Sequence, residues 1–399
     1  MNLLEGEQLS FSDLDLDKNT QLTKDEINEK YIKGEVRIIT EQARYPLTAI
    51  TNMVESNDYA LNPEFQRRHR WDNVQKSKLI ESFIMNVPIP PIFLYEDKFS
   101  HYEVMDGLQR MTAIYEFYKD KYCLEGLDEW KELNGKRYSE LPIQVRKGVD
   151  RRYLSSIILL QETAKTELEA NRLKQLVFER INSGGVKLEP QETRNAIFNG
   201  KLNQLCLKLS RNEHLCKLWG IPLPDSEEKE LGLYSDELRN NSSFAKMDDV
   251  ELVLRFFANR QRNELYKGNR FRDYLDLYLK YGNEFDSNLL GELELLFENT
   301  MKFIYDLVGE KAFWLFRFRN NNWSWYARPT TAVYDTLTLV ASSFLGQSTE
   351  ILKKSVLIES QLEEFYKKNY EAFEGRNTNP SIITEREKLF TDLFKSWLA

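Results

Sequence analysis

Residues 106–110 place a carboxylate, a glycine, an amide and a guanidinium within one short segment, Asp106-Gly107-Leu108-Gln109-Arg110. The apolar residues before Asp106 are typical of a strand, and those after Gly107 recur at helical spacing, so we expect a strand that turns into a helix. The first N–H groups of a helix attract phosphate, and a glycine lets phosphate approach the backbone closely. Arg110 could add a bidentate contact, and Asp106 could hold Mg²⁺ or orient a water. Asp-Gly also closes β-hairpins, but the helical spacing after Gly107 argues against that alternative.

The elements that position this segment alternate between strand and helix from about residue 36 to residue 200. We expect strands over 36–40, 92–95, 102–105 and 154–160, and helices over 47–54, 79–87, 111–122 and 173–181. Beyond residue 200 the strand signals fade, and helical patterns cover 256–307, 329–345, 350–370 and 382–398. The predicted class is therefore α+β, with an acidic N-terminal arm (1–35), an α/β domain (36–200) and an all-α helical domain (201–399).

The N-terminal arm is strongly acidic. Residues 1–29 hold eight acidic residues and two lysines, a charge of −6 out of −8 for the 399-residue chain. Asp15, Asp17, Asn19 and Glu26 follow the spacing of an EF-hand loop, but Thr20 stands where that loop needs glycine. We favour a solvated arm and leave calcium binding by residues 15–26 open.

Cysteine and histidine are too rare for several kinds of site. The chain has three of each, without a CxxC or HExxH pair, which argues against a disulfide framework, a zinc site and a Ser–His triad. No apolar run approaches the roughly 20 residues of a membrane helix, and the acidic start is unlike a signal peptide. We therefore expect a cytoplasmic protein without a membrane partner.

Four ordered stretches resemble the GmrSD-type restriction endonuclease N-terminal domain family, whose core is similar to the ParB/sulfiredoxin fold. They are Asn62–Arg67 with Trp71; Lys78–Ser82 through Pro88–Ile92; Asp106–Arg110; and Phe178–Asn182 with Gly185, Leu188, Glu192 and Arg194–Ala196. The sequence departs from the family at Leu108, where glutamine is common. The resemblance implies a ParB/sulfiredoxin-like fold for residues 36–200.

The resemblance also implies binding and hydrolysis of a nucleoside triphosphate, often GTP or ATP, in systems that restrict foreign or modified DNA. Asp106 would then position Mg²⁺ or water, Gln109 would orient water or a phosphate oxygen, and Arg110 would neutralise phosphate charge. The expected nucleotide-binding residues are Gln66, Arg67, Gly107, Arg180 and Asn182, although Asn182 also suits a helix C-cap. The alternative is a sensing module that binds nucleotide or DNA without hydrolysis and recruits a separate nuclease.

Basic residues gather in three segments, 63–78, 136–152 and 313–328. The candidate nucleic-acid contacts are Arg68, Arg70, Arg317 and Arg319, the last two interleaved with aromatic residues that suit base stacking. For residues 313–328 we favour the alternative of a helical core whose arginines reach solvent. We expect DNA as a direct or indirect partner, and a separate nuclease subunit because no nuclease motif is evident. Homo-oligomerisation is left open.

Overall fold

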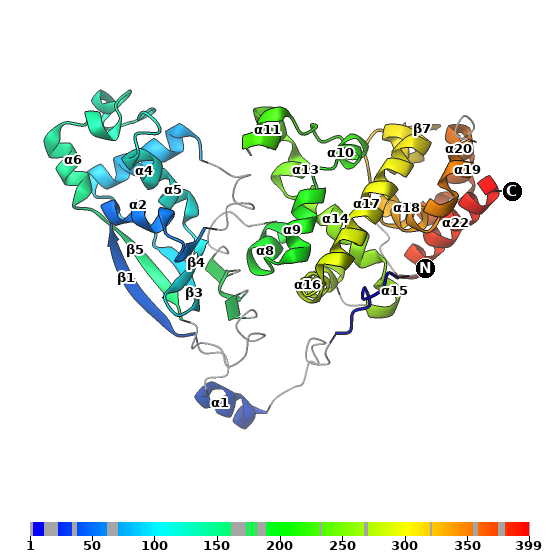
Figure 1. Ribbon diagram of the computed structural model, residues 1–399, viewed down its shortest axis with the longest axis horizontal. Helices are drawn as coiled ribbons and strands as arrows, with labels where there is room; N and C mark the ends of the chain where they lie inside the picture. Colours follow the sequence, from blue (N-terminus) through cyan, green and yellow to red (C-terminus); the bar gives the residue numbers. More distant parts are fainter. Residues whose placement is uncertain are drawn as a thin grey trace. The chain divides into compact units, whose positions relative to one another are not determined.

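The structure, a computed structural model, describes two compact units. The described residues are 3–11, 23–33, 38–61, 71–160, 173–174, 176–178, 180–181, 189–231, 234–266, 270–319, 321–353, 358–373 and 380–398. One unit, here the sheet unit, spans Asn19–Leu188, and the other, the helical unit, combines Met1–Lys18 with Glu189–Ala399 (Figure 1). The division thus differs from the predicted one, because residues 1–18 belong with the helical unit and the second boundary falls after Leu188.

The sheet unit contains a mixed five-stranded sheet in the order β1-β5-β3-β4-β2. Its strands are β1 (Thr40–Pro46), β2 (Tyr59–Ala60), β3 (Ile92–Lys98), β4 (His101–Asp106) and β5 (Tyr153–Leu159). Its helices are α1 (Lys24–Lys33), α2 (Leu47–Glu55), α4 (Asn73–Met85), α5 (Leu108–Tyr118) and α6 (Ile143–Asp150), with short 3-10 turns η2 (Lys131–Leu133) and η3 (Tyr138–Glu140). Strands β1 and β4 run antiparallel to β5 and β3, whereas β3 pairs with β5, and β2 with β4, in parallel.

The core of the sheet unit lies between the sheet and helices α2, α4, α5 and α6. Ile92 and Leu94 of β3 point into this core, whereas Tyr95 lies on the opposite face of the sheet because side chains alternate along a strand. There Lys174 forms an ion pair with Glu103, and its ammonium lies 5.5 Å from the Tyr95 ring centroid. Lys174 therefore packs against this second face of the sheet.

Most of the predicted elements of the sheet unit are confirmed. Helices α2, α4 and α5 and strands β3, β4 and β5 lie where the apolar periods placed them. Of the strand expected over residues 36–40, residues 36 and 37 lie outside the described residues, residues 38 and 39 are irregular, and only Thr40 belongs to a strand, where it begins β1. Pairing with β5 along Thr40–Pro46 sets this boundary, and that pairing leaves no local pattern in the sequence.

The helical unit is built around the long helix α17 (Ser287–Val308), which packs against α18 (Thr331–Ser343), and α18 against α22 (Pro380–Leu398) (Figure 1). The remaining helices are α8 (Pro190–Ile197), α9 (Lys201–Leu209), α10 (Glu213–Trp219), α11 (Ser226–Leu231), α12 (Asp236–Asn240), α13 (Ser242–Ala245), α14 (Asp248–Asn259), α15 (Arg262–Leu265), α16 (Phe271–Gly282), α19 (Ser348–Leu352), α20 (Ile358–Lys368) and α21 (Tyr370–Phe373), with 3-10 turns η5 (Gly309–Phe313) and η6 (Leu345–Gln347). Within the described ranges, no helix combines the length and apolar character needed to cross a bilayer.

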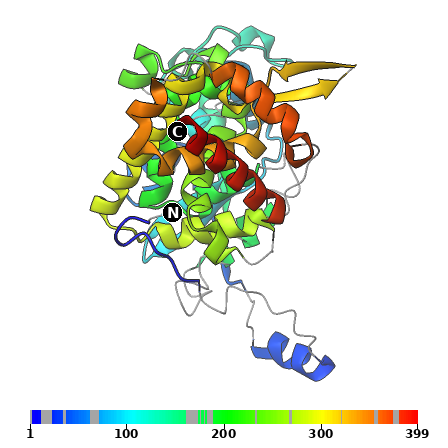
Figure 2. The same ribbon diagram turned by 90° about the vertical axis from the view of Figure 1, so that its right-hand side faces the viewer.

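The expectation of an all-α second domain was wrong in one place. Strands β6 (Leu315–Arg319) and β7 (Asn322–Tyr326) form an antiparallel hairpin within the helical unit (Figure 2). Their aromatic residues alternate with polar ones, which is the strand period rather than the helical one.

The first residues of the chain pack into the helical unit. The Glu7 side chain is fully buried, and its carboxylate accepts hydrogen bonds from Nε and Nη2 of Arg260 at 2.5 and 2.7 Å. The side-chain amide of Gln261 bonds the backbone of the same segment twice: it donates to the Glu7 carbonyl and accepts from the Leu9 N–H. This part of the acidic arm is therefore an integral piece of the helical unit. The EF-hand-like spacing falls largely outside the described residues.

Candidate functional site

The junction between β4 and α5 contains the segment that carries the predicted chemistry. Asp106 ends β4, Gly107 is the N-cap residue, and α5 begins at Leu108. The Met111 N–H donates to the Gly107 carbonyl at 3.0 Å, which closes the first helical turn. The strand therefore leads into a helix, as predicted, and the hairpin alternative is excluded.

Gly107 is required at this junction for two reasons. Its φ of +99° lies in the left-handed region that L side chains rarely adopt. A Cβ at this position would also lie 2.3 Å from Cγ2 of Ile92 on the neighbouring strand β3. The missing side chain thus makes room for Ile92, which was not evident from the sequence.

Asp106 and Arg110 meet across the first turn of α5. Nη2 of Arg110 donates to Oδ2 of Asp106 at 2.6 Å and to the Pro91 carbonyl at 3.3 Å. The Asp106 side chain is 37% exposed and the Arg110 side chain 13%. Nε of Arg110 is buried and has no hydrogen-bond partner among the described residues. A buried guanidinium donor in this position suits an additional acceptor, such as a phosphate oxygen.

Gln109 holds the chain at Trp71. Its Oε1 accepts a hydrogen bond from the Trp71 N–H at 3.2 Å, and the Trp71 side chain packs on the core of the sheet unit. Gln109 thereby tethers the backbone just before α4 to the start of α5. The sequence offered no signal for this tether, because it joins residues 38 apart.

The other predicted site residues fall into two groups. Gln66, Arg67, Arg68, Arg70 and Asn182 lie outside the described residues, so their predicted roles stay predictions. Arg180 lies in a helical stretch with an exposed side chain, and Arg317 and Arg319 lie on β6 of the helical unit. The structure therefore brings Asp106 and Arg110 together beside Gly107, whereas the side chain of Gln109 is bonded to Trp71.

Glu81, in the second of the four stretches, has a structural role. Its buried carboxylate accepts hydrogen bonds from the backbone N–H groups of Asp128, Glu129 and Trp130 at 3.3, 2.8 and 2.9 Å. These bonds fix the loop that contains η2 to α4. A carboxylate that satisfies three amides is a structural anchor for that loop.

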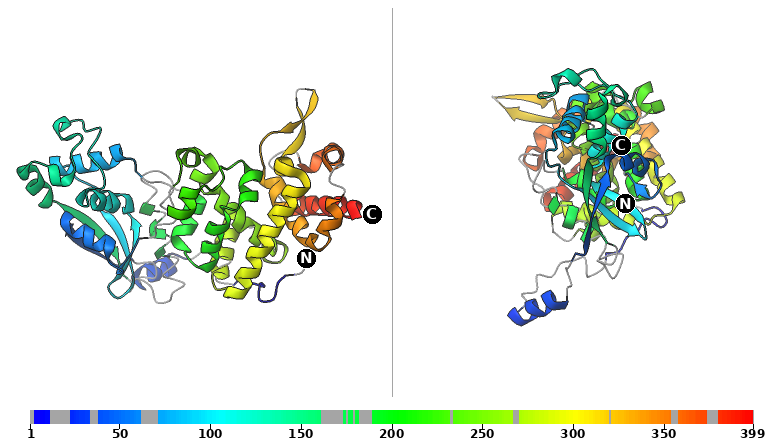
Figure 3. Two further views of the ribbon diagram at one scale, coloured as in Figure 1. Left: turned by 45° about the horizontal axis from the view of Figure 1, so that its top comes forward. Right: turned by 90° about the vertical axis from the view of Figure 1, so that its left-hand side faces the viewer.

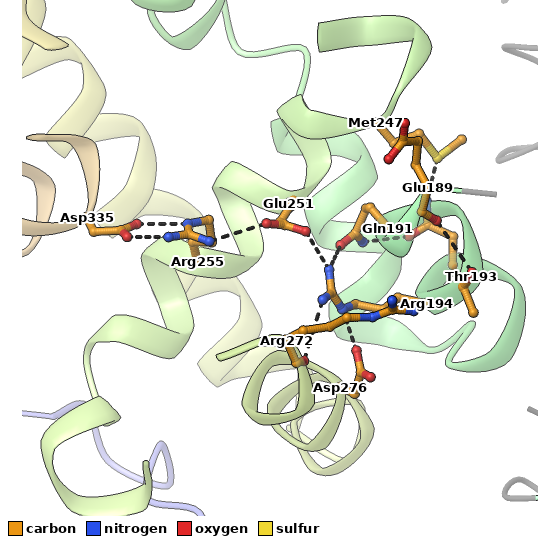
Figure 4. A network of polar contacts seen from close by, with 11 residues as sticks. Glu189, Gln191, Thr193, Arg194, Met247, Glu251, Arg255, Arg272, Asp276 and Asp335 are labelled. Carbon is orange, nitrogen blue, oxygen red and sulfur yellow. Dashed lines mark hydrogen bonds and ion pairs between the residues drawn. The ribbon is translucent and has the colours of Figure 1, made fainter. Parts of the chain in front are cut away.

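The last of the four stretches ends in a buried ion-pair network of the helical unit (Figure 4). Arg194, only 2% exposed, binds Asp276 at 2.6 Å and Glu251 at 2.7 Å. Glu251 also pairs with Arg255 at 3.3 Å, and Arg255 in turn with Asp335. Burial by itself raises the pKa of Glu251, but the charges of Arg194 and Arg255 outweigh it, so the pKa is lowered. Arg194 therefore joins α8, α14 and α16.

The mixed sheet and its covering helices define the sheet unit as an α/β domain, with Asp106 and Arg110 paired at the junction between β4 and α5. Residues 49–199 match the family model of the GmrSD restriction endonuclease N-terminal domain. The matched range continues past the sheet unit into α8, which includes Arg194. No curated protein and no solved structure matches the chain. The family match connects the protein with restriction systems.

Proposed function

We propose that this protein is the nucleoside-triphosphate-hydrolysing component, specific for GTP or ATP, of a restriction or antiphage system that acts on foreign or modified DNA. The observation that carries the proposal is the Asp106–Arg110 pair at the start of α5, inside the matched family domain. The proposal also takes the sheet unit as ParB/sulfiredoxin-like, which rests on the four resembling stretches.

Each residue of the pair has a role that its position supports. Arg110, with its buried Nε, would neutralise charge on the phosphate chain. Asp106 is the more exposed partner and would orient the attacking water or hold a metal ion. Gln109, which directly precedes Arg110 in α5, would help to orient the water.

Magnesium fits this site only together with the nucleotide. Among the described residues no group of three or more His, Cys, Asp and Glu side chains is arranged to hold a metal ion. Mg²⁺ at nucleotide sites is commonly held by one or two carboxylates, with phosphates and water as the other ligands. Asp106 is the residue that would hold it, and the ion would neutralise phosphate charge.

Cleavage of DNA would fall to a separate nuclease subunit. His214 is the one histidine that follows residue 200, and its ring packs against Tyr305 at 5.6 Å between centroids. Burial lowers its pKa, and the charge of Lys217 lowers it further. This environment supports a packing role for His214 rather than a role in a nuclease centre.

The second candidate is a module that binds nucleotide or DNA without hydrolysis. It is favoured by the contacts that the site residues already make within the chain, Arg110 with Asp106 and Pro91, and Gln109 with Trp71. In this case the four motif residues would chiefly build the turn, and phosphate release would be absent.

The decisive experiment measures binding and phosphate release for the four ribonucleoside triphosphates with Mg²⁺, in the presence and absence of DNA. Asp106→Asn should lower the release rate by at least about 100-fold while the melting temperature changes little. Asp97→Asn is a closely matched control, because Asp97 is 33% exposed, lies on the adjacent strand β3 and pairs with His101 four residues later. It should release phosphate at nearly the wild-type rate.

Two results would contradict hydrolysis at this site. The first is unchanged phosphate release by Asp106→Asn, which would move the chemistry elsewhere. The second is tight binding of a triphosphate without release by the wild-type protein, which would establish the sensing module instead.

A further inference from the structure

The β6–β7 hairpin stands out from the helices of its unit as a two-stranded ribbon (Figures 2 and 3). In its register Phe316 lies opposite Trp325 and Phe318 opposite Trp323, whereas the arginines of β6 lie opposite Ser324 and Asn322. Because side chains alternate along a strand, the ribbon has two different faces. The aromatic face comprises Phe316, Phe318, Trp323 and Trp325, and the arginine face comprises Arg317, Arg319, Asn322, Ser324 and Tyr326.

The aromatic face packs against α20 and α21. The ring of Trp325 contacts Tyr366, and its Nε1 donates to Glu363 at 3.1 Å. The ring of Trp323 contacts Tyr370 at 5.5 Å between centroids. Both indoles are therefore engaged in folding the ribbon onto the helices, which limits their use as stacking platforms for bases.

The arginine face gathers positive charge. The guanidinium carbons of Arg317 and Arg319 lie 5.2 and 5.3 Å from the centroid of the same ring, that of Tyr326. No acidic residue occurs from 313 to 328, and the exposed Arg328 lies two residues beyond the end of β7. Two guanidinium groups beside one ring concentrate positive charge on this face, and a polyanion such as DNA is complementary to it.

We propose that the arginine face of this ribbon binds double-stranded DNA, with the ribbon entering the major groove. A two-stranded ribbon has its strands about 4.8 Å apart and fits a major groove about 12 Å wide. Arg317 and Arg319 contact phosphates or guanine edges, and the exposed amide of Asn322 faces the bases. This proposal identifies the surface that would contact DNA in the proposed function. It rests on that function for the assumption that the protein acts on DNA.

The separation of the two faces favours duplex over single-stranded DNA. A protein that binds single strands needs exposed rings on which bases stack. Here the two tryptophans lie against α20 and α21, and Phe318, 45% exposed, is the aromatic residue of this face that is open to solvent. The arginine face instead carries Arg317, Arg319 and Asn322, which are residue types that contact phosphates and groove edges in duplex DNA.

The test is fluorescence anisotropy of a labelled duplex with the full chain, without nucleotide, over a range of salt concentrations. The Arg317→Gln/Arg319→Gln variant removes two phosphate contacts, so the slope of log K against log salt should fall by about 1.8. The same relation predicts a roughly 60-fold loss of affinity at about 0.1 M salt. The Arg317→Lys/Arg319→Lys variant retains both charges and should keep the wild-type slope.

The matched control is Lys208→Gln/Lys302→Gln, which removes the same charge from exposed positions on α9 and α17 of the same unit. It should bind the duplex nearly as the wild type does. The proposal is overturned if the wild type does not bind the duplex, or if it binds a single strand of equal length more tightly. It is also overturned if the arginine variant keeps the wild-type salt slope, or if the lysine control loses as much affinity as the arginine variant. Since no nucleotide is present, loss of phosphate release in Asp106→Asn would leave the DNA result unaffected, and the two proposals fail separately.

Discussion

Glu7→Gln tests whether the first residues of the chain are part of the helical unit. The side chain of Glu7 is fully buried and that of Arg260 is 3% exposed. The guanidinium of Arg260 donates two hydrogen bonds to the Glu7 carboxylate. The Leu4 N–H also donates to Oε2 of Glu7 at 2.7 Å. The variant keeps the size of the side chain but removes the charge that compensates Arg260.

The size of the effect follows from the burial of both partners. Removing one member of a buried ion pair costs about 3–5 kcal/mol, because the other charge remains buried without compensation. Domains are stable by only about 5–15 kcal/mol, so Glu7→Gln should remove a large part of the stability of the helical unit. The urea midpoint should fall by roughly 1–2 M.

The assay is urea unfolding followed by tryptophan fluorescence, since five of the seven tryptophans belong to the helical unit: Trp219, Trp314, Trp323, Trp325 and Trp397. Glu5→Gln is the matched control, because Glu5 lies two residues earlier and is exposed. It should change the free energy of unfolding by less than about 0.5 kcal/mol. If the two variants unfold at the same urea concentration, the reasoning about residues 3–11 is refuted.

Three further predictions concern the sheet unit and the ion-pair network. Gly107→Ala should destabilise the sheet unit by roughly 2–5 kcal/mol through its positive φ and the contact with Ile92, whereas Gly148→Ala on α6, with open space around it, should stabilise it by about 0.5–1 kcal/mol in thermal unfolding. Glu81→Ala should speed hydrogen exchange of the amides of residues 128–130, and unchanged exchange would contradict the anchoring role. Glu251→Gln should be destabilising at neutral pH. Because the folded-state pKa of Glu251 is lowered, its contribution is present above the ordinary value of 4.5 and is lost as pH falls below it, so the difference from wild type in urea unfolding should shrink there.

Some of the site could be predicted because its signals are local. The change from strand period to helical period on either side of Asp106 and Gly107 is contained in about ten residues, and it correctly predicted the β4–α5 junction. Asp106 and Arg110 lie four residues apart on either side of this junction, so their closeness is local, whereas the contact between their side chains comes from the structure. The hairpin at Leu315–Tyr326 has the alternation that is typical of strands, but the segments around it have helical patterns. We therefore assigned it to the helical domain and missed the two strands.

The amino-acid order thus determined which residues could form an anion site and that a helix begins directly after Gly107. Only the tertiary structure decided what surrounds that site and where the ends of the chain belong. Ile92 meets Gly107 through strand pairing, and Glu7 meets Arg260 across 253 positions of the sequence. Such contacts form between segments brought together by folding, and burial of the partners, rather than any periodic pattern along the chain, makes them strong.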